Sequence, residues 1–317
     1  MGPRTNETPA TTIVITNGKG GVGKTSLVAN IAGLAAVRGI RTLAIDLDPQ
    51  ANLAGDFGAR TQARRDDGRA MLDSACDFAL LEPIAGVRPN IDLVAAGAHT
   101  RQLAEWMTVS RGEDPTVVLA VREAIAGIRH HYDLILIDTP PAPAVLAEAG
   151  IQAADWVLSP VRADFASIDG LEQVKLCLGR MGELGLPTPP MLGVVLFDVA
   201  TQSTAVIEEI RYAVADQAAW AGPVFETVIR RSERSALDMR RWGLLAGEYR
   251  DRSGRVLNSE EARRRLQNQG LEEAAARFSR AADAVARDYD QLGVEVLERM
   301  VELVPDPVVS RPPLPVI

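Results

Sequence analysis

The sequence of 317 residues contains few cysteines, few aromatic residues and no long apolar run. Its two cysteines, Cys76 and Cys177, lie far apart without metal-ligand spacing, which argues against a disulfide framework and for a reducing compartment. No uncharged stretch approaches the roughly 18 residues of a membrane span, and the polar N-terminus MGPRTNETPATT lacks an apolar signal core. We therefore expect a cytoplasmic protein with no membrane partner.

A general excess of positive charge is missing as well. Lys and Arg number 34 against 42 Asp and Glu, so the formal net charge is −8 and any nucleic-acid contact must come from a local patch. Aromatic residues make up 4% of the chain and apolar residues 47%, which is typical of aliphatic helices packed on a buried parallel sheet. The length suits one large α/β domain or two small ones.

The most informative stretch runs from Thr12 to Gln50. A short β-branched run leads into a glycine-rich loop, which opens an apolar segment with helical spacing over 24–37. The phosphate-loop pattern of Gly, four residues and Gly-Lys-Ser/Thr is matched by Gly18, Gly23, Lys24 and Thr25. Glycines in such a loop let successive N–H groups converge on phosphate oxygens, and the following helix points its positive end at the same place. The alternative, a glycine turn without a ligand, is disfavoured because the pattern lies between a strand and a helix.

This pattern predicts a nucleoside triphosphate with Mg²⁺. Lys24 would reach the β and γ phosphates, and the Thr25 hydroxyl would bind the metal ion. Nucleotide contacts are predicted for the whole loop and the start of the helix, that is for Gly18, Lys19, Gly20, Gly21, Val22, Gly23, Lys24, Thr25 and Ser26.

Two of the predicted strands end in carboxylates. One ends in Asp46-Leu47-Asp48 before a proline, and the other, Tyr132–Asp138, runs through four apolar residues into Asp138. In open α/β sheets ligands bind at the carboxyl ends of the strands, and the second strand has the Walker B form, whose carboxylate lies near Mg²⁺. Each feature has an ordinary explanation by itself, an Asp-Pro turn or a common buried strand. Beside a phosphate loop they predict a metal site.

Strand and helix signals alternate along the chain, which predicts an α/β fold with a doubly wound, mostly parallel sheet flanked by helices. Strands are predicted at Thr12–Thr16, Arg41–Asp46, Asn90–Gly97, Tyr132–Asp138, Asp155–Pro160, Met191–Phe197 and Val224–Ile229. Helices are predicted at Lys24–Val37, Met71–Leu81, Thr100–Met107, Thr116–Arg129 (with Asp114 as its cap), Ser167–Met181, Glu260–Gln269 and Leu271–Leu303. We expect a disordered lead-in (1–11), a single P-loop ATPase domain with C-terminal helices (12–303) and a proline-rich tail (304–317). The roles of 56–90 and of an insertion at 248–270 stay unassigned.

The string Lys19-Gly20-Gly21-Val22-Gly23-Lys24-Thr25 resembles the deviant Walker A motif of the ParA/MinD superfamily of ATPases. Asp46-Leu47-Asp48-Pro49-Gln50 and Asp138-Thr139-Pro140-Pro141 resemble the second and third signatures of the same superfamily, and the resemblance covers about Thr12 to Tyr289. It points to a ParA-type (Soj-like) partition ATPase. In this superfamily the extra lysine, here Lys19, crosses a dimer interface to the partner's nucleotide, and the aspartate before the proline, here Asp48, positions the attacking water.

The resemblance implies a complete function. ATP binding would close a homodimer that binds nucleoid DNA non-specifically, and a centromere-binding protein of the ParB type would stimulate hydrolysis. It thus implies Lys19, Lys24 and Asp48 as catalytic residues, Thr25, Asp48 and Asp138 as residues at the Mg²⁺, and ATP as the nucleotide. The protein would be cytoplasmic and nucleoid-associated, with plasmid or chromosome as cargo.

A basic stretch stands out in this acidic chain, with five arginines within twelve residues: Arg230, Arg231, Arg234, Arg240 and Arg241. In ParA proteins this region leads into surfaces used for DNA binding, and arginines on phosphates give salt-sensitive, sequence-independent affinity. The alternative is a solvated face with local Asp and Glu partners. The chain also departs from the family at Arg230, where a proline is usual, and at Phe197-Asp198, so adenine contacts stay unassigned.

Three other functions are weighed. A MinD-like or flagellar-placement ATPase would need a basic amphipathic helix near the C-terminus, whereas Val294–Leu303 is acidic. A reductase relative would need cluster cysteines, and a metabolic ligase with this loop would not need the arginines. All three alternatives are therefore less favoured than DNA partition.

Overall fold

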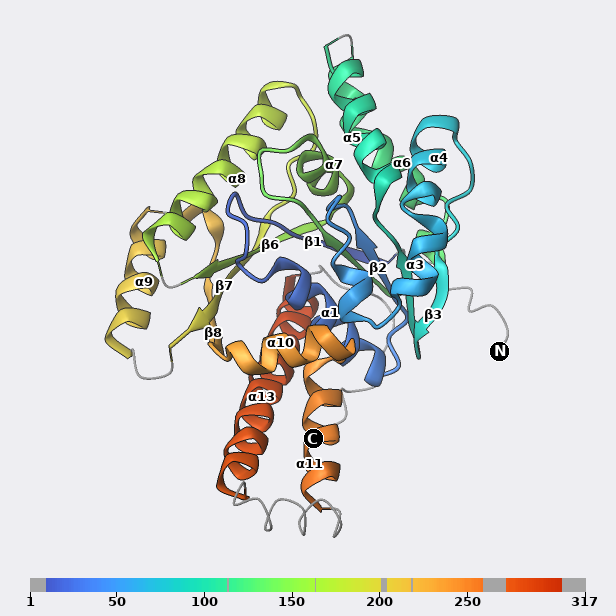
Figure 1. Cartoon of the computed structure of the whole chain (residues 1–317). Coiled ribbons are helices and arrows are strands. Elements are labelled where there is room, and N and C mark those ends of the chain that lie inside the picture. The colour runs from blue at the N-terminus through green and yellow to red at the C-terminus, as the bar shows by residue number, and fades with distance from the viewer. Residues whose placement is uncertain are drawn as a thin grey trace.

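The computed structural model describes residues 10–112, 114–162, 164–200, 204–217, 219–258 and 272–303. Its centre is an eight-stranded sheet with the order β3-β4-β2-β5-β1-β6-β7-β8, flanked by helices on both faces (Figure 1). All neighbouring strands run parallel except β3 and β4. The strands are β1 Thr11–Ile15, β2 Thr42–Asp46, β3 Ile84–Arg88, β4 Ile91–Val94, β5 Leu134–Asp138, β6 Trp156–Arg162, β7 Met191–Val199 and β8 Val224–Arg230.

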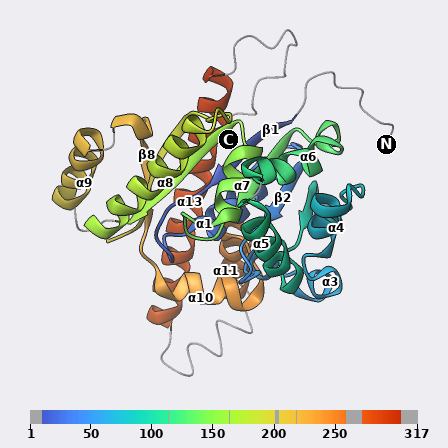
Figure 2. The ribbon, with the colours of Figure 1, turned by 90° about the horizontal axis from the view of Figure 1, so that it is seen from above.

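The helices cover the sheet in two layers, which lie above and below it in Figure 1; in the view from above, the upper layer lies in front of the sheet (Figure 2). One layer packs α4 Arg69–Asp77, α5 Ala98–Ser110, α6 Ala120–Ala126, α7 Val145–Ala153 and α8 Phe165–Glu183 on one face. The other layer contains α1 Lys24–Val37, α2 Leu53–Asp56, α3 Arg60–Asp66, α10 Glu233–Trp242, α11 Ala246–Asn258 and α13 Glu272–Leu303. The remaining elements are α9 Thr204–Gln217 beside β7 and the short turns η1 Pro115–Leu119, η2 Arg129–His131 and η3 Ala219–Ala221.

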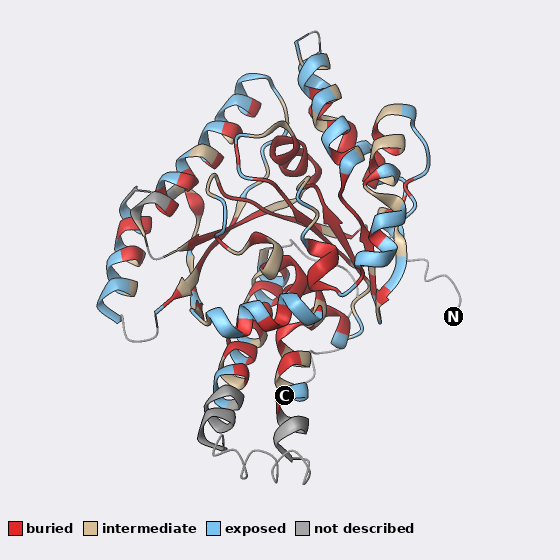
Figure 3. Ribbon diagram, in the orientation of Figure 1, coloured by how far each residue is buried: buried red, intermediate tan, exposed pale blue. Residues whose placement is uncertain are grey.

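Alternating side chains of the central strands enter two separate cores. Ile13 and Ile15 of β1 join the core beneath α1 and α13, whereas Val14 joins the core beneath α4–α8. Every residue of β2 and β5 is buried, so the middle of the sheet is red throughout in Figure 3. This is why these strands read as continuous apolar runs in the sequence.

The predicted fold class is confirmed, and α1 has the predicted bounds. The stretch 56–90, whose role was left unassigned, contains the end of α2, then α3, α4 and the antiparallel strand β3. The helix predicted at Thr116–Arg129 is divided into η1 and α6, and Asp114 caps its start by accepting a hydrogen bond from the N–H of Thr116 (2.8 Å). The helix predicted at Met71–Leu81 ends at Asp77, because Phe78 adopts a left-handed conformation (φ 57°).

Several other predictions fall wholly or partly on residues that the structure does not describe. The first nine residues of the lead-in, the predicted helix Glu260–Gln269 and the proline-rich tail lie outside them. Thr11 belongs to β1, and α11 takes up the beginning of the stretch predicted as an insertion. No described helix is long and apolar enough to cross a membrane.

Helix α13 closes the sheet edge formed by β8. Its Glu295 carboxylate accepts hydrogen bonds from the backbone N–H groups of Glu226 (2.6 Å) and Thr227 (3.1 Å). Farther along the strand, Asp288 accepts the N–H of Arg230 (3.0 Å) and both arms of its guanidinium (2.6 and 2.7 Å). A sheet edge with unpaired N–H groups is a template for unwanted strand pairing. The acidic character of α13 therefore serves to satisfy this edge.

We expect Glu295→Ala to lower the free energy of unfolding by about 2 kcal/mol, because two backbone N–H groups lose a charged acceptor. Glu298→Ala is the matched control, since this exposed residue lies on the same helix, and its effect should stay within about 0.5 kcal/mol. Urea unfolding of both variants checks the prediction. Equal losses in the two variants would show that the carboxylate of Glu295 does not hold the edge.

Candidate nucleotide-binding site

The predicted loop lies where β1 meets α1, at the carboxyl edge of the sheet. Gly18 to Gly23 form the connection, and Lys24, Thr25 and Ser26 begin the helix. Val22 is buried, whereas Gly20 and Gly21 are exposed. Gly23 is the N-cap of α1 with φ 93°, and no side chain caps the helix there. The first N–H groups of α1 are thus available to an anion, as the phosphate-loop pattern requires.

The loop is held from below by a residue that the sequence analysis did not single out, Asn17. Its amide nitrogen donates to the Pro160 carbonyl (3.0 Å), and its amide oxygen accepts the N–H of Lys19 (2.8 Å). The N–H of Gly18 donates to the carbonyl of Gly170 on α8 (3.0 Å). A Cβ at Gly170 would lie 2.0 Å from the Asn17 oxygen, so this approach requires glycine. The only sequence signal for this role of Asn17 was its position, as an amide residue directly before the loop.

Lys24 is buried at the start of α1 and faces negative groups. Burial lowers the pKa of its ammonium, while Asp138 and Asp48 act to raise it. Its Nζ donates to the backbone carbonyl of Lys19 (3.2 Å), which places it inside the curve of the loop. A cation in this position would meet phosphate oxygens.

Ser26, predicted as a nucleotide contact, also lies beside C-terminal parts of the chain. Its hydroxyl is close to Asp56 of α2, whose pKa is raised by burial and lowered in part by Arg240 and Ser26. Tyr289 of α13 lies next to the same hydroxyl, and burial raises the pKa of its phenol. The structure thus connects the end of the phosphate loop to α2, α10 and α13.

Two buried carboxylates lie side by side in this site. Asp46 and Asp138 occupy the same register position on the adjacent strands β2 and β5. Asp46 accepts the backbone N–H groups of Asp48 (3.0 Å) and Leu53 (3.1 Å), so it holds the loop that carries Asp48. Burial and the charge of Asp138 raise the pKa of Asp46 well above its ordinary value. This supporting role of Asp46 was not assigned from the sequence, where Asp48 and Asp138 received functions.

Asp138 is left without a normal hydrogen bond at either carboxylate oxygen, although it is 1% exposed. Burial raises its pKa to about 7, and the nearby Thr25 hydroxyl and Lys24 ammonium act in the opposite direction. The Thr25 hydroxyl is close enough for this effect, yet no hydrogen bond of ordinary geometry joins the two groups. A buried carboxylate of this kind is costly unless a cation or a proton accompanies it.

These residues fit a Mg²⁺ ion that arrives with a nucleotide. Within the described ranges, no three His, Cys, Asp or Glu side chains converge to hold a metal by themselves. Mg²⁺ usually takes one or two carboxylates, keeps several waters and shares phosphate oxygens. Thr25 and the unsatisfied Asp138 would supply the protein side of such a site. Asp48 stands half-buried beside them, and its carboxylate accepts the N–H of Gln50 (3.0 Å).

Lys19 turns away from the centre of the loop in the single chain. Its Nζ lies 2.7 Å from the Asp164 carboxylate, which also caps α8 by accepting the N–H of Ser167 (2.8 Å). Partial burial acts to raise the pKa of Asp164, but the bonds from Lys19 and Ser167 hold it below its ordinary value. The two predicted lysines therefore have separate partners.

The basic stretch is mostly paired with carboxylates. Arg230 binds Asp288 as described above, and the others pair as Arg231 with Asp198 (3.4 Å), Arg234 with Asp238 (2.8 Å) and Arg240 with Asp56 (3.5 Å). Arg241 is exposed and takes part in no ion pair among the described residues. These contacts match the alternative of a locally paired face for four of the five arginines. DNA binding by the stretch stays a prediction.

Phe197 lies over the loop at the position where the chain departs from the family. A Cβ at Gly23 would come within 2.4 Å of its ring, so the ring packs directly on the last glycine of the loop. The following Asp198 holds both Arg162 and Arg231. An aromatic ring therefore walls one side of the site.

A phosphate loop between β1 and α1, with a buried aspartate on the neighbouring strand β5, defines the P-loop NTPase class. A family model described as an AAA domain matches residues 10–183. The chain is 33% identical over 232 residues to the sporulation initiation inhibitor protein Soj of Bacillus subtilis, covering 70% of this chain and 85% of the relative. It is 30% identical over 234 residues to the chromosome partitioning protein ParA of Caulobacter vibrioides, covering 71% and 82%.

The fold agrees with a solved structure. An ATP complex of McdA from Cyanothece matches with a TM-score of 0.69 at 20% identity, covering 96% of this chain and all of that one. The chain belongs to the ParA/MinD superfamily of P-loop ATPases, as a member of its ParA-type (Soj-like) partition ATPase family.

The raised pKa of Asp138 predicts a dependence of stability on pH. The folded chain keeps a proton that the unfolded chain releases near pH 4, so the free energy of unfolding should fall as the pH rises from about 4 to about 7 and level off above that. Asp138→Asn has no proton to lose and should show a shallower fall, measured by urea unfolding of the nucleotide-free chain. Asp216→Asn, an exposed site on α9, should keep the wild-type slope. Identical slopes in all three proteins would contradict the prediction.

Proposed function

We propose that this chain is an ATP-dependent DNA partition ATPase that hydrolyses ATP with Mg²⁺. The observation that carries the proposal is the group formed by the buried Lys24, the half-buried Thr25 and the buried, unsatisfied Asp138 at the phosphate loop. The names of the bacterial relatives, chromosome partitioning protein ParA among them, support the partition role. Plasmid and chromosome are both compatible cargoes.

In the proposed reaction the chain's own groups position and stabilise the transferred phosphoryl group. Backbone N–H groups of the loop and Lys24 would hold the β and γ phosphates and stabilise the charge that develops on them. Asp48 would orient the attacking water from the rim of the site. Mg²⁺, held through Thr25 and Asp138, would supply charge neutralisation at the phosphate oxygens when bound.

Lys19 would complete the site of a second copy. In the single chain its side chain is bound to Asp164, and only its backbone carbonyl contacts Lys24. An ATP-bound homodimer in which Lys19 exchanges Asp164 for the partner's phosphates would make hydrolysis depend on assembly. A ParB-type protein that binds this dimer would then stimulate ATP hydrolysis and thereby the release of the dimer from DNA.

The DNA contact is proposed for the basic stretch, with Arg241 and the half-exposed Arg240 as its most available cations. Arg231 and Arg234 lie on the same segment and would add phosphate contacts if their ion pairs open. Arg230 is the most firmly held, because Asp288 binds its guanidinium twice. Contacts to phosphates alone would give binding without sequence preference.

Substitution of two site residues separates binding from hydrolysis. Lys24→Ala should abolish ATP turnover and weaken nucleotide binding, because it removes the buried cation. Asp48→Asn should lower turnover by at least about 10²-fold with ATP affinity nearly unchanged, since an amide cannot position the water as the carboxylate does. Phosphate release and fluorescent-nucleotide binding measure the two effects, with Asp216→Asn as the inert control. Unchanged turnover in either variant would refute the hydrolytic assignment.

The DNA contact is tested by its dependence on salt. In the presence of ATP and Mg²⁺, Arg240→Ala/Arg241→Ala should weaken binding to duplex DNA of any sequence and reduce the slope of log affinity against log salt by about 2. Arg101→Ala, an exposed arginine on α5, is the control and should leave the slope unchanged. Binding that is equal with ATP and ADP would remove the nucleotide-controlled DNA role. ATP-dependent binding with an unaltered slope would move the contact to another surface.

A further inference from the structure

A strained and exposed aromatic residue ends helix α4. Phe78 is the C-cap of the helix with φ 57° and ψ 25°, the left-handed region in which glycine or asparagine is favoured. Its side chain is 84% exposed, and two residues later Leu80 is 67% exposed. The chain thus accepts backbone strain where it presents a large apolar side chain to solvent. Strain of this kind that persists in a fold is a pointer to function.

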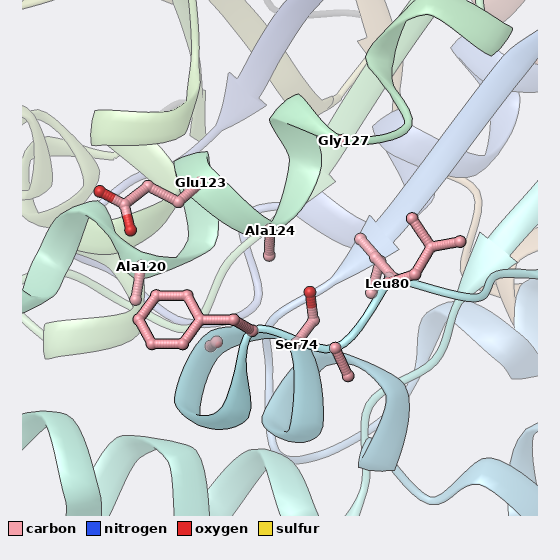
Figure 4. Close-up of a pocket in the computed structure, with 10 residues that line it drawn as sticks. Ser74, Leu80, Ala120, Glu123, Ala124 and Gly127 are labelled. Carbon is pink, nitrogen blue, oxygen red and sulfur yellow. The ribbon is translucent and has the colours of Figure 1, made fainter.

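Beside Phe78 lies a hollow between α4 and α6 with a volume of about 170 Å³. Ala120 and Ala124 of α6 and its C-cap Gly127, all small, lie opposite Ser74 of α4, and Leu80 borders one end (Figure 4). An apolar cavity of about 150 Å³ holds a benzene molecule, whereas cofactor sites need about 300–1,000 Å³. The hollow is therefore sized for one apolar side chain.

One carboxylate lines this hollow, and two more adjoin its lining residues in the chain. Glu123 lines it, and Asp77 and Glu82 are the chain neighbours of its lining residues Phe78 and Leu81. All three are exposed, and none takes part in an ion pair among the described residues.

Nearby cations do not balance these charges. Arg69 is bound to Asp73 (3.1 Å), and Arg122 on α6 is one exposed cation against the three carboxylates. The negative surroundings are also felt by Cys76, where burial raises the pKa of the thiol and Asp77 and Asp73 raise it further. The rim is therefore net negative and would attract a positively charged partner.

We propose that this hollow docks a partner protein through a short segment that carries one apolar side chain flanked by Lys or Arg. The apolar side chain would enter between Phe78 and the small residues of α6, and its basic neighbours would pair with Glu123, Asp77 and Glu82. No lining residue belongs to the phosphate loop or to a strand. The site is therefore separate from the nucleotide and does not depend on the proposed function.

The test uses short fluorescein-labelled peptides and fluorescence polarisation. One peptide carries a Leu between Lys residues in a Gly-Ser background, and two companions replace the Leu with Ala or the Lys residues with Glu. The Lys-Leu-Lys peptide should bind, and either replacement should weaken binding about tenfold. Absence of binding, or equal binding of all three peptides, would overturn the proposal.

Phe78→Gly separates a docking role from a structural one. Glycine adopts the left-handed conformation without strain, so the variant should keep or raise the melting temperature while peptide affinity falls about tenfold. Tyr212→Ala, a similarly exposed aromatic residue on α9, should leave affinity unchanged. Glu123→Lys should shift the preference toward the Glu-flanked peptide. A lower melting temperature with unchanged affinity in Phe78→Gly would overturn the proposal, as would self-association of the chain that Phe78→Gly abolishes.

Discussion

The balance of buried charge at the carboxyl ends of β2 and β5 is the constraint on which the site depends. Asp46 and Asp138 share a register position, and both are removed from water. Asp46 is compensated by two backbone N–H groups, which hold the following loop. Asp138 has no such partners, and Lys24 and Thr25 only partly offset its burial. A cation that arrives together with phosphates would compensate the carboxylate of Asp138. The uncompensated charge therefore favours the binding of a ligand that brings a cation.

The same compensation of charge operates away from the site. The long helix α13 uses Glu295 and Asp288 to satisfy the N–H groups of the sheet edge, and Asp288 thereby holds Arg230. Asp56 holds Arg240 close to Ser26 at the end of the phosphate loop. Carboxylates on helices thus restrain the basic stretch from several sides. Most arginines of the basic stretch therefore form ion pairs within the fold. Only its unpaired part is available to a ligand.

Lys19 and Phe78, the residues on which the two proposed contacts depend, differ in how the fold holds their side chains. Lys19 has a partner in its own chain, Asp164, which also caps α8, so a second role for this lysine requires an exchange of contacts. Phe78 is mostly exposed and sits on strained backbone beside a hollow with an acidic rim. The first is an ion pair near the phosphate loop, and the second is an exposed apolar side chain on the outer helices.

The sequence by itself determined the loop from Gly18 to Ser26, the position of α1 and the alternation of strands and helices that predicts a mostly parallel sheet. These features follow from local backbone preferences and from the spacing of apolar residues. Only the tertiary structure decided the partners of the charges. Lys19 meets Asp164 across 145 residues, and Arg230 meets Asp288 across 58, separations that no local pattern encodes. It also showed that β3 closes one edge as an antiparallel strand and that Asp46, not only Asp48, supports the site. The physical reason is that chain neighbours set local conformation, whereas the packing of the sheet and helices decides which buried charges stand together.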